Sequence, residues 1–527
     1  MTDTIIVGAG TAGCVLASRL SEDTNHRVTL LEAGGDDDNR LIRIPAGFTK
    51  LLNNPVYNWC FNADPESNTF DRTIPIPRGK VLGGSSAING MVIVRGQPAD
   101  YDRWSAAGND GWAWKDVLPY FKRFENYRYA DNDLRGKNGP VNIDKVNFRN
   151  ALTDAFLAAA QAEGFPFNDD YNGSNQEGIA YAQMNQKNGV RVSSAAAYLA
   201  PAKHRRNLEI KTGCHVTRLV MEGRRCVGVE YVSNGQKQII RSNRVILSAG
   251  GVQSPQILEL SGIGDPKILS AAGISVIHEL PGVGENYRDH YCPRMNWRIT
   301  QRVTFNERSR GLPLAREVIR YYVKKEGLLA LPVCLFAAFI KSRPDAPIPD
   351  IQLAFNIASY NSHAKRELER LPGMTVALYQ LRPESQGSIH VKNADPFAPP
   401  AIKPNFLSTE TDRKVVIDGL KTIRRIVQNS HLDAFRGAEM NPGLQVNTDD
   451  EWLDFARRNG NTAFHVIGTC KMGNDNMAVV DSKLRVRGLD NLYVVDASVM
   501  PTEVSGNPNA AVYMIAEKGS DLVRRGV

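Results

Sequence analysis

Residues 4–13 read TIIVGAGTAG, an apolar β-branched run followed by glycines at positions 8, 10 and 13. The apolar run predicts a parallel strand buried on both faces. The residues after the glycines, with Val15, Leu16 and Leu20 on one face, predict a helix. A second apolar run, RVTLL at residues 27–31, predicts another strand. The stretch therefore predicts a βαβ unit.

The three glycines have the spacing of a dinucleotide-binding turn. Gly8 permits the tight turn, Gly10 lets the backbone approach a pyrophosphate, and Gly13 lets the helix pack closely on the strand. Backbone amides at the helix start would face the anion. Glu32, at the end of the second strand, can accept hydrogen bonds from a ribose and would repel a 2′-phosphate. We therefore predict NAD or FAD binding, not NADP, with further contacts from Thr11, Ala12 and Ala33.

A second glycine cluster favours FAD over NAD. Residues 78–91 read RGKVLGGSSAINGM and combine glycines, small hydroxyl side chains and an amide. Such a segment can run very close to a flat ligand and offer it backbone donors. A simple nicotinamide dehydrogenase has no need of it.

With these motifs, the chain resembles the glucose–methanol–choline (GMC) oxidoreductases, which are FAD enzymes that oxidise alcohols. The resemblance extends over essentially the whole chain, and the bacterial choline-dehydrogenase-like and alcohol-dehydrogenase-like branch is the most similar. It is carried by the two glycine segments with Glu32 and by matches at residues 247–258, 261–264, 280–286, 289–290, 464–473 and 495–519.

The resemblance implies that His465 is the catalytic base and Asn507 its partner. A histidine has a pKa near the operating pH and can remove the hydroxyl proton. An amide can hold the resulting alkoxide while hydride passes to flavin N5. Asn507 and Pro508 also predict a helix N-cap and a first helical residue, at a positive helix end that would face the flavin. His290 belongs to a family motif, but we expect a structural role for it.

The resemblance also implies a set of FAD contacts. Val216 would meet the adenine, and Asp496 and Ala497 the ribityl–pyrophosphate region. Some relatives attach FAD through a histidine just before the Asn89 position, and the residue there is Ile88, which predicts noncovalent FAD. The remaining expected contacts are Arg78, Val81, Gly83, Gly84, Ser85, Asn89, Gly90, Met91, Val92, Ala249, Gly250, Asn507 and Pro508.

The strands expected of the nucleotide sheet are scattered along the chain. Residues 244–247 and 491–495 read as further buried strands, whereas residues 350–355 and 374–378 alternate as in a half-buried antiparallel sheet. We predict an α/β fold (α+β overall), in which a Rossmann-type FAD-binding domain is interleaved with a substrate-binding domain built on an antiparallel sheet. The expected FAD-binding segments are 1–150, 206–290 and 451–527, and the expected substrate-binding segments are 151–205 and 291–450.

The composition is that of an ordinary globular protein, with 42% hydrophobic and 23% charged residues. The net charge of +8 suits an anionic cofactor, but the basic residues are too dispersed for nucleic-acid binding. Seven cysteines occur singly, which indicates neither a zinc site nor a disulfide framework. Because three residues precede the first strand, we expect no secretory signal and a cytoplasmic protein.

Two segments bear on membrane contact. The apolar residues 327–340 are too few to span a bilayer and are expected to form buried strands. Residues 316–325 (REVIRYYVKK) are basic with two tyrosines. They predict either a solvated helix over the substrate pocket or a helix resting on the inner face of an anionic membrane.

We therefore expect oxidation of a primary alcohol to its aldehyde, with electrons passing to a quinone-like acceptor or O2. The alternatives are a lyase of the same fold that cleaves cyanohydrins and, less favoured, a non-catalytic FAD-binding protein. A choline enzyme would need a carboxylate and aromatic faces, for which Tyr360, Tyr379 and Glu384 are candidates. The alcohol and the oligomeric state stay open.

Overall fold

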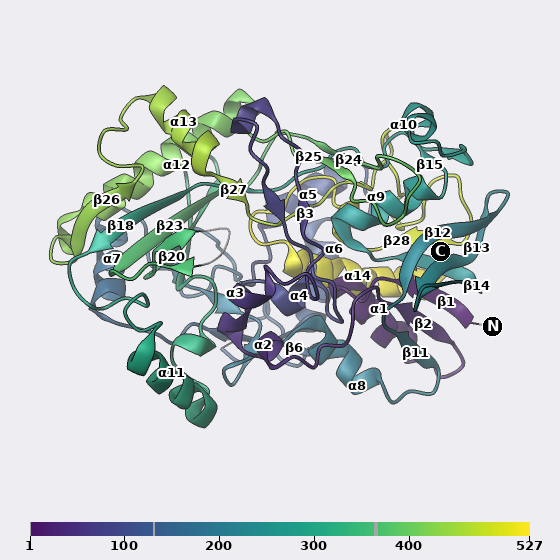
Figure 1. Cartoon of the computed structure of the whole chain (residues 1–527), viewed down its shortest axis with the longest axis horizontal. Helices are drawn as coiled ribbons and strands as arrows, with labels where there is room; N and C mark the ends of the chain where they lie inside the picture. Colours follow the sequence, from purple (N-terminus) through teal and green to yellow (C-terminus); the bar gives the residue numbers. More distant parts are fainter. Residues whose placement is uncertain (1, 130–131, 363–366, 527) are drawn as a thin grey trace.

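The computed structural model describes residues 2–129, 132–362 and 367–526. Its first sheet has seven strands in the order β11-β2-β1-β14-β13-β12, and β28 also pairs with β14. The last two strands of this order, β13 (Arg225–Ser233) and β12 (His215–Glu222), are antiparallel to each other. β1 lies parallel between β2 and β14, and β14 pairs in parallel with β28. The parallel strands are β1 (Thr2–Val7), β2 (Val28–Leu31), β11 (Leu208–Lys211), the end of β14 (Gln236–Leu247) and β28 (Leu492–Val494). Segments from the beginning, middle and end of the chain thus lie side by side (Figure 1).

Helices from opposite ends of the chain cover this sheet. α1 (Thr11–Leu20) is buried on nearly all sides, as expected for a helix whose residues are mostly apolar or small. It packs against α14 (Asn509–Arg524), and the guanidinium of Arg19 donates hydrogen bonds from Nε and Nη2 to the carboxylate of Glu517. In Figure 1 the purple α1 and the yellow α14 lie side by side next to the strands of this sheet.

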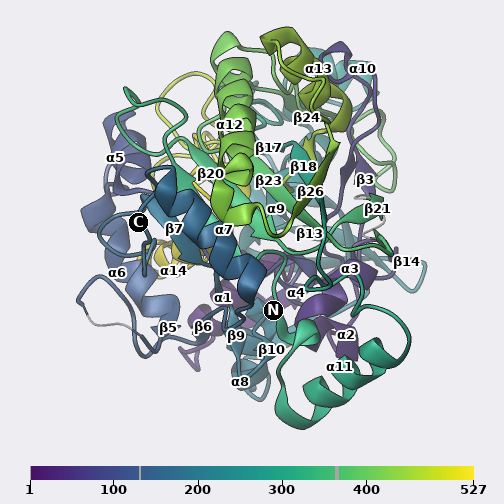
Figure 2. The ribbon, with the colours of Figure 1, turned by 90° about the vertical axis from the view of Figure 1, so that its left-hand side faces the viewer.

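The second sheet is antiparallel, with six strands in the order β26-β18-β23-β20-β19-β7. α12 (Glu410–Gln428) and α7 (Ala151–Ala162) lie across its outer face (Figure 2). Gly419 of α12 allows this close packing, because a Cβ atom there would lie 2.1 Å from Cδ1 of Leu378. The strands are β7 (Gly178–Tyr181), β18 (Arg294–Ile299), β19 (Phe336–Ile340), β20 (Ile351–Asn356), β23 (Gly373–Gln380) and β26 (Arg436–Asn441).

The predicted fold class is confirmed: a Rossmann-type sheet is interleaved with a domain on an antiparallel sheet. Two packing details differ from the expected domain limits. The turn Ala195–Leu199 packs on α1 of the nucleotide domain. Trp452 and Phe455, on α13 (Asp449–Asn459), belong to the core of the antiparallel domain. Buried apolar side chains decide these placements, and their partners are distant in the chain.

The apolar residues 327–340 form a strand only in their second half. A short 3-10 turn, Leu328–Ala330, precedes β19, and Pro332 lies between them. Within the described ranges, no helix is long and apolar enough to cross a membrane.

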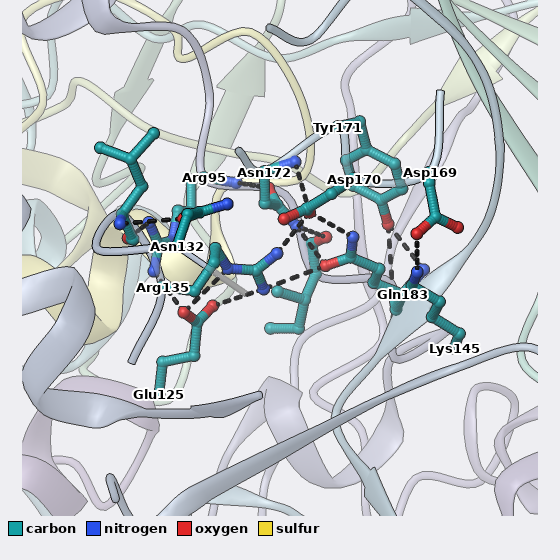
Figure 3. Close-up of polar contacts among 12 residues, drawn as sticks. Arg95, Glu125, Asn132, Arg135, Lys145, Asp169, Asp170, Tyr171, Asn172 and Gln183 are labelled. Carbon is teal, nitrogen blue, oxygen red and sulfur yellow. Dashed lines mark hydrogen bonds and ion pairs between the residues drawn. The ribbon is translucent and has the colours of Figure 1, made fainter. Parts of the chain in front are cut away.

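A buried ionic network supports the segment that follows the second glycine cluster (Figure 3). Glu125 accepts hydrogen bonds from the guanidinium groups of Arg95 and Arg135, and all three side chains are buried. Asn172 accepts a hydrogen bond of 2.7 Å from the backbone N–H of Arg95. Burial raises the pKa of Glu125, but the two guanidinium groups outweigh it and hold that pKa below its usual value. The network ties residues 93–97 to loops from elsewhere in the first half of the chain.

Candidate active site

One long cavity extends from the carboxyl ends of the parallel strands to the antiparallel sheet. Its first end is lined by the glycine turn after β1, by Glu32 after β2 and by residues 214–216. Its other end is lined by Arg294, Val333, Tyr379, His465 and Asn507. Parallel α/β sheets bind ligands at the carboxyl ends of their strands, and this cavity lies at that place.

Most of the predicted site residues line this cavity. They are Gly8, Gly10, Thr11, Ala12, Glu32, Ala33, Arg78, Gly84, Ser85, Asn89, Gly90, Met91, Val92, Val216, Ala249, Gly250, His465, Asp496, Ala497, Asn507 and Pro508.

Gly13, Val81 and Gly83 are not among the residues that line the cavity. Gly13 packs behind the turn, where a Cβ atom would lie 1.9 Å from the carbonyl oxygen of Gly8. Val81 is buried in a small apolar cluster. Gly83 donates its backbone N–H to the carbonyl oxygen of Ala9 at 2.8 Å. All three hold the cavity wall in place from behind.

The first end of the cavity suits a pyrophosphate. Gly8 has a φ of +95°, and Gly84 approaches so closely that its Cβ atom would lie 2.7 Å from Cα of Gly10. Only glycine is free of steric cost at such positions. The backbone of the turn is therefore exposed to the cavity at the start of α1, where unpaired amides favour an anion.

Glu32 stabilises this turn. Its carboxylate accepts hydrogen bonds of 2.8 Å from the backbone N–H groups of Ala9 and Gly34. Burial raises the pKa of Glu32 to about 7. Each carboxylate oxygen can still accept a second hydrogen bond, so the predicted ribose contact is compatible with this geometry.

The backbone around His465 is held in a strained turn. Phe464 has a φ of +68°, a conformation that is costly for a residue with a large side chain. Its N–H donates to the Thr462 hydroxyl at 2.7 Å, and the N–H of His465 donates to the Asp289 carboxylate at 2.8 Å. Asp289 is buried, and burial raises its pKa to about 6. These contacts aim the imidazole of His465 into the cavity.

A chain of hydrogen bonds determines the tautomer of His465. Nε2 of His290 lies 3.1 Å from the carbonyl oxygen of Leu381, which can only accept, so this nitrogen carries the hydrogen. In a neutral imidazole, Nδ1 of His290 is then an acceptor. Nδ1 of His465 lies 2.8 Å from it and must be the donor. Nε2 of His465 is therefore unprotonated.

Asn507 continues this chain on the cavity side. Its Nδ2 lies 2.9 Å from Nε2 of His465 and donates to it, and its Oδ1 accepts from Nε2 of Gln352 at 3.2 Å. The predicted N-cap role is wrong, since α14 begins at Asn509 and no side chain caps it. The Asn507 side chain bonds to His465 instead.

Burial keeps both histidines neutral. It lowers the pKa of His290 to about 4, and it lowers the pKa of His465 well below the usual histidine value, with His290 and Arg78 lowering it further. The carboxyl group of Glu503 lies 4.0 Å from Nδ1 of His290, and burial raises its pKa well above the usual value. His465 thus faces the cavity as a free base.

The sequence did not reveal several of these partners. His290 was expected to be structural, and its ring contacts His465 directly. Gln352 and Arg294 lie on strands of the antiparallel sheet, and no local motif marks them. Asp289 and His290 stood in a motif that could have suggested their proximity to His465. In the part of the chain that the structure describes, no three His, Cys, Asp or Glu side chains could together hold a metal ion.

Comparisons with known proteins identify the relatives of this chain. Two family models described as GMC oxidoreductase match residues 2–292 and 383–516. An alcohol dehydrogenase (acceptor) of Pseudomonas putida is 40% identical over 100% of this chain and 96% of its own length. An oxygen-dependent choline dehydrogenase of Photobacterium profundum is 40% identical over 99% of this chain and 92% of its own. The crystal structure of pyridoxine 4-oxidase from Mesorbium loti superposes with a TM-score of 0.91 at 31% identity and covers 100% of this chain and 99% of that one.

Proposed function

The chain belongs to the GMC oxidoreductase family, and we propose that it binds FAD and oxidises a primary alcohol to an aldehyde. The observation that carries this proposal is the unprotonated Nε2 atom of His465, which lies in the cavity within hydrogen-bond distance of the amide of Asn507. The names of the alcohol and choline dehydrogenases that the chain resembles support a CH–OH donor.

The cavity suits FAD along its whole length. The turn at Gly8 and Gly10 would hold the pyrophosphate, Glu32 the ribose and Val216 the adenine. Asn89 and Gly90 would contact the flavin, next to Pro508 at the start of α14. Arg78 supports this assignment, because its Nε atom is buried without a partner among the described residues. Bound FAD supplies the acceptor for the carbon-bound hydride of the alcohol.

The residues at the far end of the cavity would activate the alcohol. The hydroxyl group replaces the contact between Asn507 and His465, so that its proton passes to Nε2 of His465. Throughout this step Nδ1 of His465 stays protonated and donates its hydrogen bond to Nδ1 of His290. This hydrogen bond holds the ring in the orientation in which Nε2 receives the proton. The amide of Asn507 donates to the alkoxide that forms.

Two alternatives are less well supported. A lyase of the same fold is not favoured, because the relatives with 40% identity are named as dehydrogenases. A non-catalytic protein would have no need for the ordered hydrogen bonds from Leu381 to His465.

We further propose that the reduced flavin passes its electrons to a quinone-like acceptor or to O2.

The test is an anaerobic absorbance titration of the purified holoprotein with a panel of alcohols. Loss of the oxidised flavin band at roughly 450 nm would support the proposal, and admission of air would then show whether O2 is the acceptor. Cyanohydrin cleavage without bleaching by any alcohol would support the lyase instead.

We also propose that α11 (Gly311–Lys324) rests on an anionic membrane surface. This helix projects from the body of the molecule (Figures 1 and 2). Three apolar side chains at helical spacing are exposed: Leu312 by 78%, Ile319 by 63% and Val323 by 74%. Exposed Arg316, Arg320 and Lys324 lie beside them. An apolar stripe flanked by cations is typical of a helix that lies in the headgroup region of a bilayer.

A further inference from the structure

Arg294 lies on the face of the antiparallel sheet that covers His465 and Asn507. It pairs with Ala377 on β23, and Tyr379 on β23 pairs with Gln352 on β20. Directly paired residues, and residues two apart on one strand, point to the same face of a sheet. The Tyr379 ring lies 6.1 Å from the His465 ring, and Gln352 bonds to Asn507. Arg294 therefore shares the face that covers the proposed reaction site.

The guanidinium of Arg294 is buried but poorly paired. The residue is only 8% exposed, and it lines the cavity. In the described part of the chain, its one hydrogen bond runs 3.3 Å from Nη1 to the carbonyl oxygen of Cys292. No carboxylate of the described residues forms an ion pair with it. A guanidinium has five N–H donors and keeps its charge, so burial without a counter-charge is costly.

No carboxylate of the cavity wall is available to neutralise it. The two acidic side chains that line the described cavity are Glu32 and Asp496. Glu32 is held by the amides of the first glycine turn. Asp496 accepts hydrogen bonds from the N–H of Gly250 at 2.8 Å and from the hydroxyl of Ser254 at 2.5 Å. The charge beside Tyr379 is therefore positive.

We propose that the alcohol substrate carries a carboxylate and that Arg294 binds this group. This inference rests on the proposed function and names its substrate class: a hydroxy acid whose hydroxymethyl group and carboxylate stand at opposite ends of an apolar body. The planar guanidinium can hold a carboxylate through two parallel hydrogen bonds. Tyr379 and Val333 offer apolar surface to the part between.

The same arrangement disfavours choline. Of the three side chains considered as a site for a quaternary ammonium, Tyr379 lines the cavity, whereas Tyr360 and Glu384 do not. A cation on the Tyr379 ring would face the positive charge of Arg294 with no carboxylate to offset it. Overall identity of 40% to choline dehydrogenases is compatible with this difference, because a few cavity residues set specificity.

The binding experiment needs no turnover. Benzoate is titrated into the FAD-loaded protein, and its binding is followed by the change in flavin absorbance. We expect Arg294→Met to weaken benzoate binding by about 10- to 100-fold, the loss of a charge-assisted pair, and Arg294→Lys to lie between. Arg298→Met is the matched control: Arg298 lies on the same strand but pairs with Glu369 outside the cavity, and its loss should leave benzoate binding unchanged. Equal benzoate affinity in the wild type and Arg294→Met would overturn the inference.

The second readout is anaerobic flavin reduction with two alcohols of similar shape, 4-(hydroxymethyl)benzoate and 4-methylbenzyl alcohol, together with choline. We expect the wild type to prefer the carboxylate by at least about tenfold. Arg294→Met should lose that preference, because its rate with the carboxylate should fall much further than its rate with the neutral alcohol. A wild type that prefers choline or the neutral alcohol would refute the substrate class. Arg294-dependent benzoate binding without reduction by any alcohol would refute the oxidation and support the anion site.

Discussion

Nδ1 of His290 accepts the Nδ1 hydrogen of His465 across 2.8 Å. The order of donors runs back to the carbonyl oxygen of Leu381, which cannot donate. A backbone atom outside the cavity therefore determines which nitrogen of His465 can receive a proton.

His290→Ala should slow flavin reduction. Without the acceptor, His465 can place its hydrogen on either nitrogen, and a hydrogen bond of about 1 kcal/mol corresponds to a loss of about 5-fold in rate at saturating alcohol. KM should change little, because His290 does not line the cavity. His290→Gln offers an acceptor again and should recover part of the rate. An effect on KM alone would contradict a positioning role.

His465→Ala should lower the rate of flavin reduction by about 10²- to 10⁴-fold, the range for loss of a general base. FAD should stay bound, since the glycine turn and the residues 84–92 remain intact. Stopped-flow absorbance measures the rate, and the absorbance spectrum of the purified variant measures flavin content. His431→Ala, at an exposed histidine, is the control. A rate within a few-fold of the wild type would exclude His465 as the base.

The pH dependence should show a base that stays neutral at unusually low pH. The folded pKa of His290 is lowered to about 4 and that of His465 lies well below its usual value, both through burial. The reduction rate should therefore be constant from about pH 8 to pH 6.5 and below. An unfolded histidine binds a proton below about pH 6.5, so the contribution of these two histidines to the free energy of unfolding should fall as the pH drops from there through about 4. The raised pKa values of Glu32 and Asp289 contribute in the opposite direction. A rate that halves near pH 6.5 would contradict this environment.

Acid precipitation should release all of the flavin into the supernatant. Ile88 lines the cavity where some relatives carry a histidine, and its side chain has no nucleophile. Yellow colour that remains with the washed precipitate would show a covalent bond formed elsewhere.

The protein should sediment with phosphatidylglycerol vesicles and not with phosphatidylcholine vesicles, and the binding should weaken as salt is added. Replacing Leu312 and Val323 of α11 by serine should abolish it while leaving flavin reduction unchanged. Ile239→Ser, at a side chain that is 59% exposed on β14, is the matched control. If the α11 variant still binds the vesicles, the membrane contact lies elsewhere on the protein. If the protein instead self-associates through α11, this helix is a protein–protein interface.

Local patterns predicted the parts of the fold that depend on neighbours in the sequence. The βαβ unit, the strands at residues 350–355 and 374–378 and the glycine turns follow from periodicity and turn chemistry. Local patterns could not show that the first half of β14 is antiparallel to β13 (Arg225–Ser233) while its second half is parallel to β1.

The far end of the site was less predictable. Arg294 and Tyr379 share one face only because β18 and β23 align Arg294 with Ala377. That register follows from burial over the whole antiparallel sheet, which no short window of sequence contains. The contact between His290 and His465 was not predicted for a similar reason. The two residues are far apart in the sequence, and the strained turn at Phe464 brings His465 to His290.

The insertion of β14 between β1 and β28 has a consequence for biosynthesis. The ribosome delivers β1 first, but the neighbours that complete its sheet follow much later, and Asn507 comes after all of them. At about 5 to 20 residues per second, the first strand waits on the order of 25 to 100 s for Asn507 to be translated. A nascent chain therefore displays an apolar, flavin-free half-sheet for most of its synthesis, and chaperones that shield such edges should influence the yield of yellow protein.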